Sequence, residues 1–242
     1  WRGRFGEGAQ ITRECTDVLS GYIDAQPDDD EAVLLFGHSL SWQGKFARFL
    51  GNASDASRFI NRGLEALESI GESALDFKGE KAFLLLNMGD AIRESDREAA
   101  RRYYDDCLEL YGDANDAWGR ANALAAQGWL IQHWGNYNEA RKIYHESLSL
   151  RRALGDIRGE AESLRSVAGV ALYQGYLEEA EQLTWQSIEI AEKIGDRAGK
   201  AASLGKLGET QIALGQFKNA IHALNESLKI YLDLGLAMPS AY

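Results

Sequence analysis

A sequence pattern recurs every 40 residues in this chain, and it leaves few folds open to it. Residues 154–161 read LGDIRGEA, and residues 194–201 read IGDRAGKA. When the chain is shifted by 40 positions, segments that begin at Gly119, Gly159 and Gly199 align without a gap. A fixed period of this length is typical of repeat architectures, in which each unit packs mainly against its neighbours.

The aligned segments keep small, apolar and turn residues at equivalent places. The matching positions include Leu124, Leu164 and Leu204; Gly135, Gly175 and Gly215; Ala140, Ala180 and Ala220; Ser147, Ser187 and Ser227; and Gly155, Gly195 and Gly235. Two further copies precede these. One keeps the same register from Gly79, and the other is offset by 44 residues because ESALDFKG replaces a four-residue turn such as DIRG.

Each copy is predicted to be a hairpin of two helices. In residues 157–196, apolar residues recur at three- and four-residue steps on both sides of Gly175, so each side has one apolar helical face. Glycine readily takes the left-handed conformation that ends a helix, and Asp196 is suited to cap the next one. The small residues Gly128, Ala168 and Gly208 are expected to face the alanines at 140, 180 and 220, which allows interaxial distances of about 8–10 Å.

Because a lone hairpin cannot bury both of its faces, the copies are expected to stack into an all-α solenoid of about eleven helices. The predicted divisions are 1–30, the second half of a truncated repeat; repeats at 31–74, 75–115, 116–155, 156–195 and 196–235; and a tail at 236–242. GRFGEG at 3–8 aligns with GNYNEA at 135–140, which places Gly3 at a turn. With Trp1 as its first residue, the chain is interpreted as an excerpt from a longer protein.

The pattern resembles the tetratricopeptide repeat over nearly the whole chain. A leucine and a glycine four residues apart, an aromatic residue after the turn and then an alanine are present as Leu204, Gly208, Phe217 and Ala220. The resemblance implies a right-handed superhelix. The usual period is about 34 residues, so the 40-residue period here indicates longer helices.

The LGD…G turn and the A…ESL helix are similar to the subtype at the C-terminus of bacterial signal-transducing STAND ATPases, which include regulators like the maltose activator. This resemblance implies a sensor domain attached to an upstream ATPase module. Related repeats occur in spindle-orientation adaptors and kinesin light chains, so the alternative is a free-standing adaptor that bridges two proteins.

Charge and composition exclude several functions. The net charge of −11 disfavours generic nucleic-acid binding, because an acidic chain repels phosphate backbones. No apolar run approaches the roughly 20 residues that span a bilayer, and no signal peptide is recognised, so no membrane partner is expected. Two cysteines form no disulfide framework, which fits a cytoplasmic location.

No motif predicts catalysis, and no catalytic residue, cofactor or metal site is assigned. The chain has no GxxxxGK[ST], HExxH or GxSxG sequence, and its four histidines lack the spacing of metal ligands. Cys15 and Cys107 occupy the small-residue position of the repeat and are expected to be buried. DDDE at 28–31 could bind a metal, but an acidic helix start is favoured.

The resemblance implies that the first helix of each hairpin lines a concave groove. Transferred by alignment, the candidate groove residues are His38, Lys45, Arg48, Phe49, Arg93, Trp129, Gln132, His133, Glu162, Arg165, Tyr173 and Glu209. Cations beside aromatic side chains suit a protein or peptide ligand that is itself acidic. The alternative is that these are solvated charges next to packed aromatic residues.

The last predicted helix carries an apolar face without a polar capping helix after it. Its apolar residues are Ile221, Leu224, Leu228, Ile230, Tyr231 and Leu234. Solenoid ends normally need a polar cap for solubility. Either further repeats follow Tyr242, or this end associates with another copy of the chain.

Overall fold

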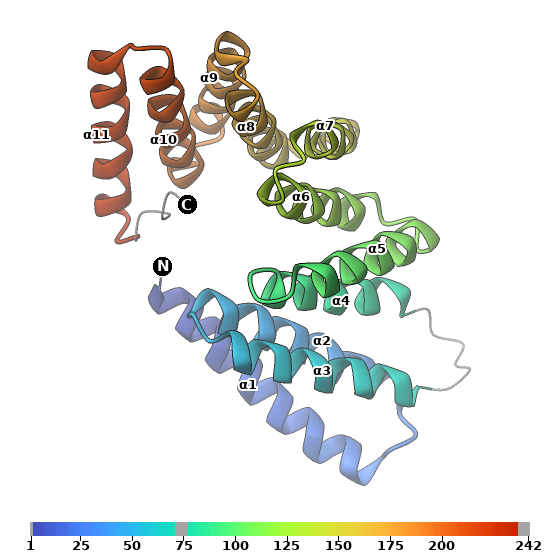
Figure 1. The fold of residues 1–242 in the computed structure, drawn as a ribbon. Coiled ribbons are helices and arrows are strands. Elements are labelled where there is room, and N and C mark those ends of the chain that lie inside the picture. The colour runs from blue at the N-terminus through green and yellow to red at the C-terminus, as the bar shows by residue number, and fades with distance from the viewer. Residues whose placement is uncertain (1, 71–76, 237–242) are drawn as a thin grey trace. The chain divides into compact units, whose positions relative to one another are not determined.

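The computed structural model describes residues 2–70 and 77–236, with side chains from Gly6 onward, and every regular element in these ranges is an α-helix (Figure 1). The eleven described helices are α1 (Arg2–Ala25), α2 (Asp30–Phe49), α3 (Ala53–Ser69), α4 (Lys78–Ile92), α5 (Arg97–Asp113), α6 (Ala117–His133), α7 (Tyr137–Leu154), α8 (Ile157–Tyr173), α9 (Leu177–Lys193), α10 (Arg197–Ala213) and α11 (Phe217–Asp233). The predicted all-α class is confirmed.

Helices that follow one another in the chain pack together as stacked hairpins. Within residues 2–126, α2 packs against α3 and α4 against α5, and α3 also contacts α4. Within residues 127–236, α8 pairs with α9 and α10 with α11, and α9 contacts α10. Hairpins stacked in chain order form the solenoid of the tetratricopeptide type. The two residue ranges are compact units, and the boundary between them lies within α6.

The LGD…G signature is explained by the turn between hairpins. Gly155 has a φ of 67° and ends α7 in the left-handed conformation. The Asp156 carboxylate then accepts a hydrogen bond from the Gly159 backbone N–H at 2.9 Å. A Cβ atom on Gly159 would collide with that carboxylate, so glycine is the residue that fits. Asn115 takes the equivalent left-handed position one repeat earlier, with a φ of 53°.

The turn inside a hairpin uses a second glycine. Gly175 has a φ of 81°, and the Tyr176 backbone N–H donates to the Ala171 carbonyl oxygen at 2.9 Å. This bond spans the turn in the manner of a Schellman motif and satisfies a carbonyl that the helix itself leaves free.

The small residues at the crossing of the paired helices face different partners from those predicted. A Cβ on Gly128 would lie 2.7 Å from the Tyr144 ring, and one on Gly208 would lie 2.5 Å from Leu224 Cγ. The expected facing alanines are one helical turn earlier. Helical side chains point toward the N-terminus of their helix, so the residue one turn later covers the glycine.

Two further expectations at the start of the chain are wrong. Gly3 lies inside α1 rather than in a turn. Cys15 is exposed, whereas Cys107 is buried as predicted. The buried place is taken instead by the next residue, Thr16, whose Oγ1 lies 2.7 Å from Ser39 Oγ on α2.

The acidic run at 28–31 begins a helix, as favoured. Asp29 caps α2 by accepting from the Ala32 backbone N–H at 3.0 Å, and Asp30 and Glu31 lie in the first turn. The expectations for Trp1, for most of the ESALDFKG insertion and for the tail after Leu236 fall outside the described residues. Among the helices that are described, none combines the length and apolar character of a membrane span.

Candidate functional site

The candidate groove residues of the first unit form one connected cluster on two neighbouring first helices, α2 and α4. We call it the α2–α4 cluster, and it consists of His38, Trp42, Lys45, Arg48, Phe49, Phe83, Asp90 and Arg93. The helices contact each other directly, so side chains from both reach the same surface. Sequence reasoning named five of these residues and missed Trp42, Phe83 and Asp90.

Lys45 is surrounded by aromatic side chains. Its Nζ lies 4.9 Å from the centroid of the Trp42 ring and 5.3 Å from that of Phe83. Trp42 in turn donates a hydrogen bond from Nε1 to His38 Nε2 at 3.0 Å, and His38 stacks on Phe83 with ring centroids 6.1 Å apart. Burial lowers the pKa of Lys45, Arg48 lowers it further, and the Asp90 carboxylate opposes the shift.

Asp90 is the common partner of both arginines in the cluster. Arg48 Nη2 lies 3.3 Å from its Oδ2, and Arg93 Nη1 lies 3.3 Å from its Oδ1. The Tyr104 hydroxyl also donates to Oδ1 at 2.9 Å. The Arg48 guanidinium additionally lies over the Phe49 ring, 4.7 Å from its centroid. The arginines are therefore held in place rather than freely solvated.

The α2–α4 cluster has an excess of positive charge. Lys45, Arg48 and Arg93 are three cations, and Asp90 is the single carboxylate among them, so three minus one leaves a local charge of +2 in a chain of net charge −11. The arginine side chains are about one-fifth exposed, at 22% and 19%, so a ligand reaches them from one side. Within the described residues, the buried Arg48 Nε has no hydrogen-bond partner.

The candidate groove residues of the second unit do not form one cluster. Trp129 stacks on His133 with ring centroids 3.7 Å apart, and Gln132 accepts a hydrogen bond from the Tyr144 hydroxyl at 3.2 Å. Each of the others has a different neighbour. Glu162 pairs with Arg151, Tyr173 stacks on Tyr137, Glu209 pairs with Lys206, and Arg165 acts electrostatically on Tyr231.

Glu162 belongs to a structural ion pair. Its partner Arg151 is 4% exposed and also donates to the Gly159 carbonyl oxygen at 2.7 Å, so the pair holds the start of α8 against α7. The second unit also has a cleft that sequence reasoning missed, between α7 and α9 on the second helices of successive hairpins. Its cleft residues stand out in the repeat alignment because Arg141, Lys142 and His145 replace the Glu181, Gln182 and Trp185 of the next copy.

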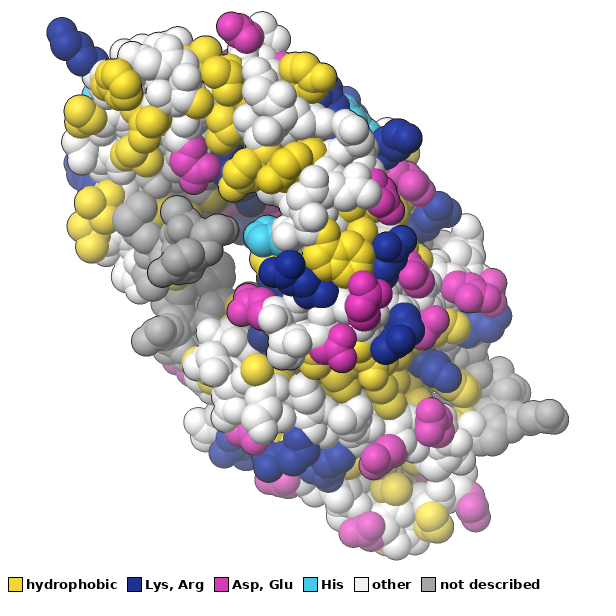
Figure 2. Space-filling model, in the orientation of Figure 1, with side chains coloured by type: hydrophobic (Ala, Val, Ile, Leu, Met, Phe, Trp, Pro, Cys, Tyr) yellow, Lys and Arg dark blue, Asp and Glu magenta, His cyan; other side chains and the backbone are white. Residues whose placement is uncertain are grey.

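The outer face of α11 exposes apolar side chains. Phe217, Ile221 and Leu232 are 63%, 61% and 69% exposed, and Leu228 is partly exposed. Figure 2 shows hydrophobic side chains gathered over this helix. In the preceding copy, Ile188 at the position of Leu228 is buried against α10, so α11 presents the surface on which a following helix packs.

Metal chemistry has no support in the described ranges. Within residues 2–70 and 77–236, no group of three or more His, Cys, Asp or Glu side chains is placed to hold a metal ion.

Comparison with known families supports the repeat assignment. The tetratricopeptide repeat family model matches residues 159–233. This matched part covers α8–α11, in which the 40-residue pattern is most regular. No curated protein matches the sequence.

Solved structures share the fold across most of the chain. BtubC (BKLC) from P. vanneervenii superposes with a TM-score of 0.75 at 12% identity, over 98% of this chain and 95% of that one. A Rap protein complexed with competence and sporulation factor gives 0.72 at 15% identity, over 89% of this chain and 60% of that one. The Rap conjugation gene regulator of plasmid pLS20, in complex with the Phr* peptide, gives 0.70 at 16% identity, over 85% and 56%. At these identities the likeness concerns the fold alone.

Proposed function

We propose that this chain is a protein-interaction domain that captures an acidic protein segment on the α2–α4 cluster. The single observation that carries the proposal is the grouping of Lys45, Arg48 and Arg93 around one carboxylate, beside partly exposed aromatic rings. Carboxylates pair well with guanidinium groups, and aromatic residues with arginine are the side chains enriched in protein interfaces. Two of the similar folds were solved with a peptide or factor bound, which supports peptide capture.

An acidic ligand fits this cluster better than a basic or neutral one. The local charge of +2 attracts a carboxylate at short range, where salt screens partly buried charges least. The rest of the acidic chain repels the same ligand at longer range. Recognition therefore depends on close contact with the cluster, and long-range steering contributes little.

In the full protein, we propose that this domain is the C-terminal sensor of a bacterial STAND signalling ATPase. Binding of the ligand would bias the attached ATPase between its inactive and oligomerising states. Sequencing the residues upstream of Trp1 tests this role, since a P-loop followed by a winged-helix region supports it. A short leader or an unrelated catalytic domain upstream contradicts the sensor role. Further repeats or short partner motifs on both flanks favour the second candidate, a free-standing adaptor that bridges two proteins.

Titration with an acetylated hexaglutamate peptide tests the binding surface. The readout is the NMR signal of the Trp42 indole N–H, which reports on this cluster because that group donates to His38. Arg48→Glu combined with Arg93→Glu is expected to weaken binding by at least about tenfold, the effect of losing about 1.4 kcal/mol. A hexaglutamine peptide is expected not to shift the signal.

The matched control carries the same change in charge elsewhere in the unit. Arg58→Glu with Arg101→Glu alters two more exposed arginines on α3 and α5 and is expected to leave the isotherm unchanged. Thermal unfolding confirms that both double variants are folded. Equal affinities for the wild type and the Arg48/Arg93 variant would rule out the cluster as the binding surface.

A further inference from the structure

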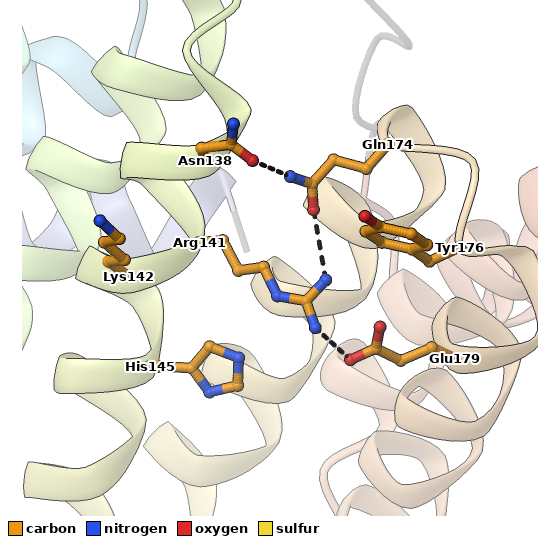
Figure 3. A pocket seen from close by; sticks show the side chains of 7 residues that line it. All are labelled: Asn138, Arg141, Lys142, His145, Gln174, Tyr176 and Glu179. Atoms are coloured by element: carbon orange, nitrogen blue, oxygen red, sulfur yellow. Dashed lines mark hydrogen bonds and ion pairs between the residues drawn. The ribbon is translucent and has the colours of Figure 1, made fainter.

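A separate open cleft of about 820 Å³ lies between α7 and α9, on the face formed by the second helices of the hairpins. Figure 3 shows Asn138, Arg141, Lys142 and His145 on one side of it, with Gln174, Tyr176 and Glu179 opposite. None of these residues belongs to the α2–α4 cluster.

Arg141 spans the cleft and is held in place by hydrogen bonds to its opposite side. It reaches across to Glu179 Oε1 at 2.6 Å and to Gln174 Oε1 at 3.2 Å, and its guanidinium lies 5.4 Å from the centroid of the Tyr176 ring (Figure 3). Gln174 is held in turn, since its Nε2 donates to Asn138 Oδ1 at 2.8 Å. The Arg141–Glu179 pair is therefore neutral and pre-organised before any ligand enters.

Two other polar groups in the cleft have no partner of their own. Lys142 is exposed and forms no ion pair with any residue in the described ranges. The His145 ring nitrogens likewise make no hydrogen bond within the described chain. Two cations, Arg141 and Lys142, against the one carboxylate of Glu179 leave a charge of +1 in the cleft, and His145 can add a further proton.

The repeat provides an internal comparison that removes a packing explanation. The positions of Arg141, Lys142 and His145 are occupied by Glu181, Gln182 and Trp185 in α9 and by Ile221, His222 and Asn225 in α11. The packing residues around them, Ala140 and Ser147, are kept in both later copies. The helices α9 and α11 form with acidic, polar or apolar residues at these positions, so a helix at this place in the repeat does not require the basic set of α7.

We propose that the α7–α9 cleft is a second binding site, which takes the carboxylate side chain of an acidic protein segment. Lys142 forms the ion pair with the incoming carboxylate, and His145 donates a hydrogen bond to it. A monoanion matches the charge of this cleft. Arg141 is already engaged by Glu179, so the bidentate arginine contact that favours a phosphate dianion is not available.

The test follows the His145 ring protons by NMR while the full chain is titrated with acetylated hexaglutamate. Lys142→Gln and His145→Gln are both changes at exposed positions and are expected to keep the wild-type melting temperature. Lys142→Gln is expected to weaken the binding seen at His145 by about fivefold to tenfold. For His145→Gln, the backbone amide of residue 142 replaces the ring as the reporter.

Two controls separate this site from others. His222→Gln changes the position equivalent to Lys142 two repeats later and is expected to have no effect on the His145 isotherm. The Arg48→Glu/Arg93→Glu variant is expected to leave it unchanged as well, so failure at the α2–α4 cluster is distinguishable from failure here.

Three outcomes would overturn the proposal. One is the absence of any shift at His145 up to millimolar peptide. Another is an isotherm that Lys142→Gln leaves unchanged. The last is tighter binding of a phosphoserine peptide than of hexaglutamate, which would assign the cleft to phosphate instead of carboxylate.

Discussion

Arg48 Nη2 lies 3.3 Å from Asp90 Oδ2, and this contact joins α2 to α4 at the surface that we propose for ligand capture. The same carboxylate also serves Arg93 and Tyr104, so one acidic side chain positions two cations and a phenol. Replacing the Asp90 carboxylate therefore distinguishes the contribution of the cluster to stability from its contribution to binding.

Asp90→Asn is expected to lower the free energy of unfolding by about 1–3 kcal/mol, because two partly buried guanidinium groups lose their counter-ion. The same variant is expected to bind hexaglutamate more tightly, since the local charge rises by one. Urea unfolding and the peptide titration measure the two effects. Asp105→Asn, at an exposed pair with Arg101, is the control and is expected to change stability by less than about 0.5 kcal/mol.

Lys45→Met is expected to raise the unfolding free energy by about 0.5–1 kcal/mol while it weakens acidic-peptide binding. Burial lowers the pKa of Lys45, so its ammonium is less favourable in the folded chain than in water at neutral pH. Methionine keeps an apolar stem against Trp42 and Phe83 and removes the charge. A less stable variant with undiminished binding would show that Lys45 serves packing alone.

Two glycines of α10 are expected to respond oppositely to alanine. A Cβ on Gly208 would lie 2.5 Å from Leu224 Cγ, so Gly208→Ala is expected to destabilise the chain by about 1–3 kcal/mol. A Cβ on Gly205 would lie 3.7 Å from Ser227 Oγ, an ordinary contact, so Gly205→Ala is expected to stabilise by up to about 1 kcal/mol through helix propensity. Equal melting temperatures for the two variants would contradict the crossing geometry.

Binding at the α7–α9 cleft is expected to strengthen as the pH falls from about 8 to about 6. Partial burial of the ring in the cleft lowers the pKa of His145, Arg141 and Arg152 lower it further, and Glu179 opposes them, so the ring is neutral in the free cleft at pH 7. An entering carboxylate raises that pKa, so the bound state holds more protons and binding is favoured at lower pH. His145→Gln is expected to remove this pH dependence of binding. A steep pH dependence in that variant would show that another group takes up the proton.

Self-association through α11 is expected to appear as a molar mass that increases with protein concentration in light scattering. Ile221→Lys combined with Leu232→Lys places charge on the exposed apolar face and is expected to restore the monomer mass. Val18→Lys, at a residue of α1 that is 73% exposed, is the control for added charge and is expected to leave association unchanged. A monomer mass at all concentrations for the unaltered chain would exclude this contact.

The features that could be predicted correctly from the amino-acid sequence are those that depend on residues close together in the chain. The turn formed by Gly155, Asp156 and Gly159 depends only on residues close together in the chain. Its residues recur in the repeat pattern, so the ends of the helices could be predicted from them. The periodic apolar positions likewise predicted stacked hairpins, because each helix buries its apolar face against the helices next to it in the chain.

The side chains that meet across hairpins could be identified only from the folded structure. The contact of Arg48 with Asp90, the enclosure of Lys45 by Phe83 and the reach of Arg141 to Glu179 join residues 38–42 positions apart, on different helices. These contacts could not be predicted from the sequence, because they depend on the register between helices and on the rotamers of long side chains. A one-turn difference in register changes the partner, as the glycines that face Tyr144 and Leu224 show.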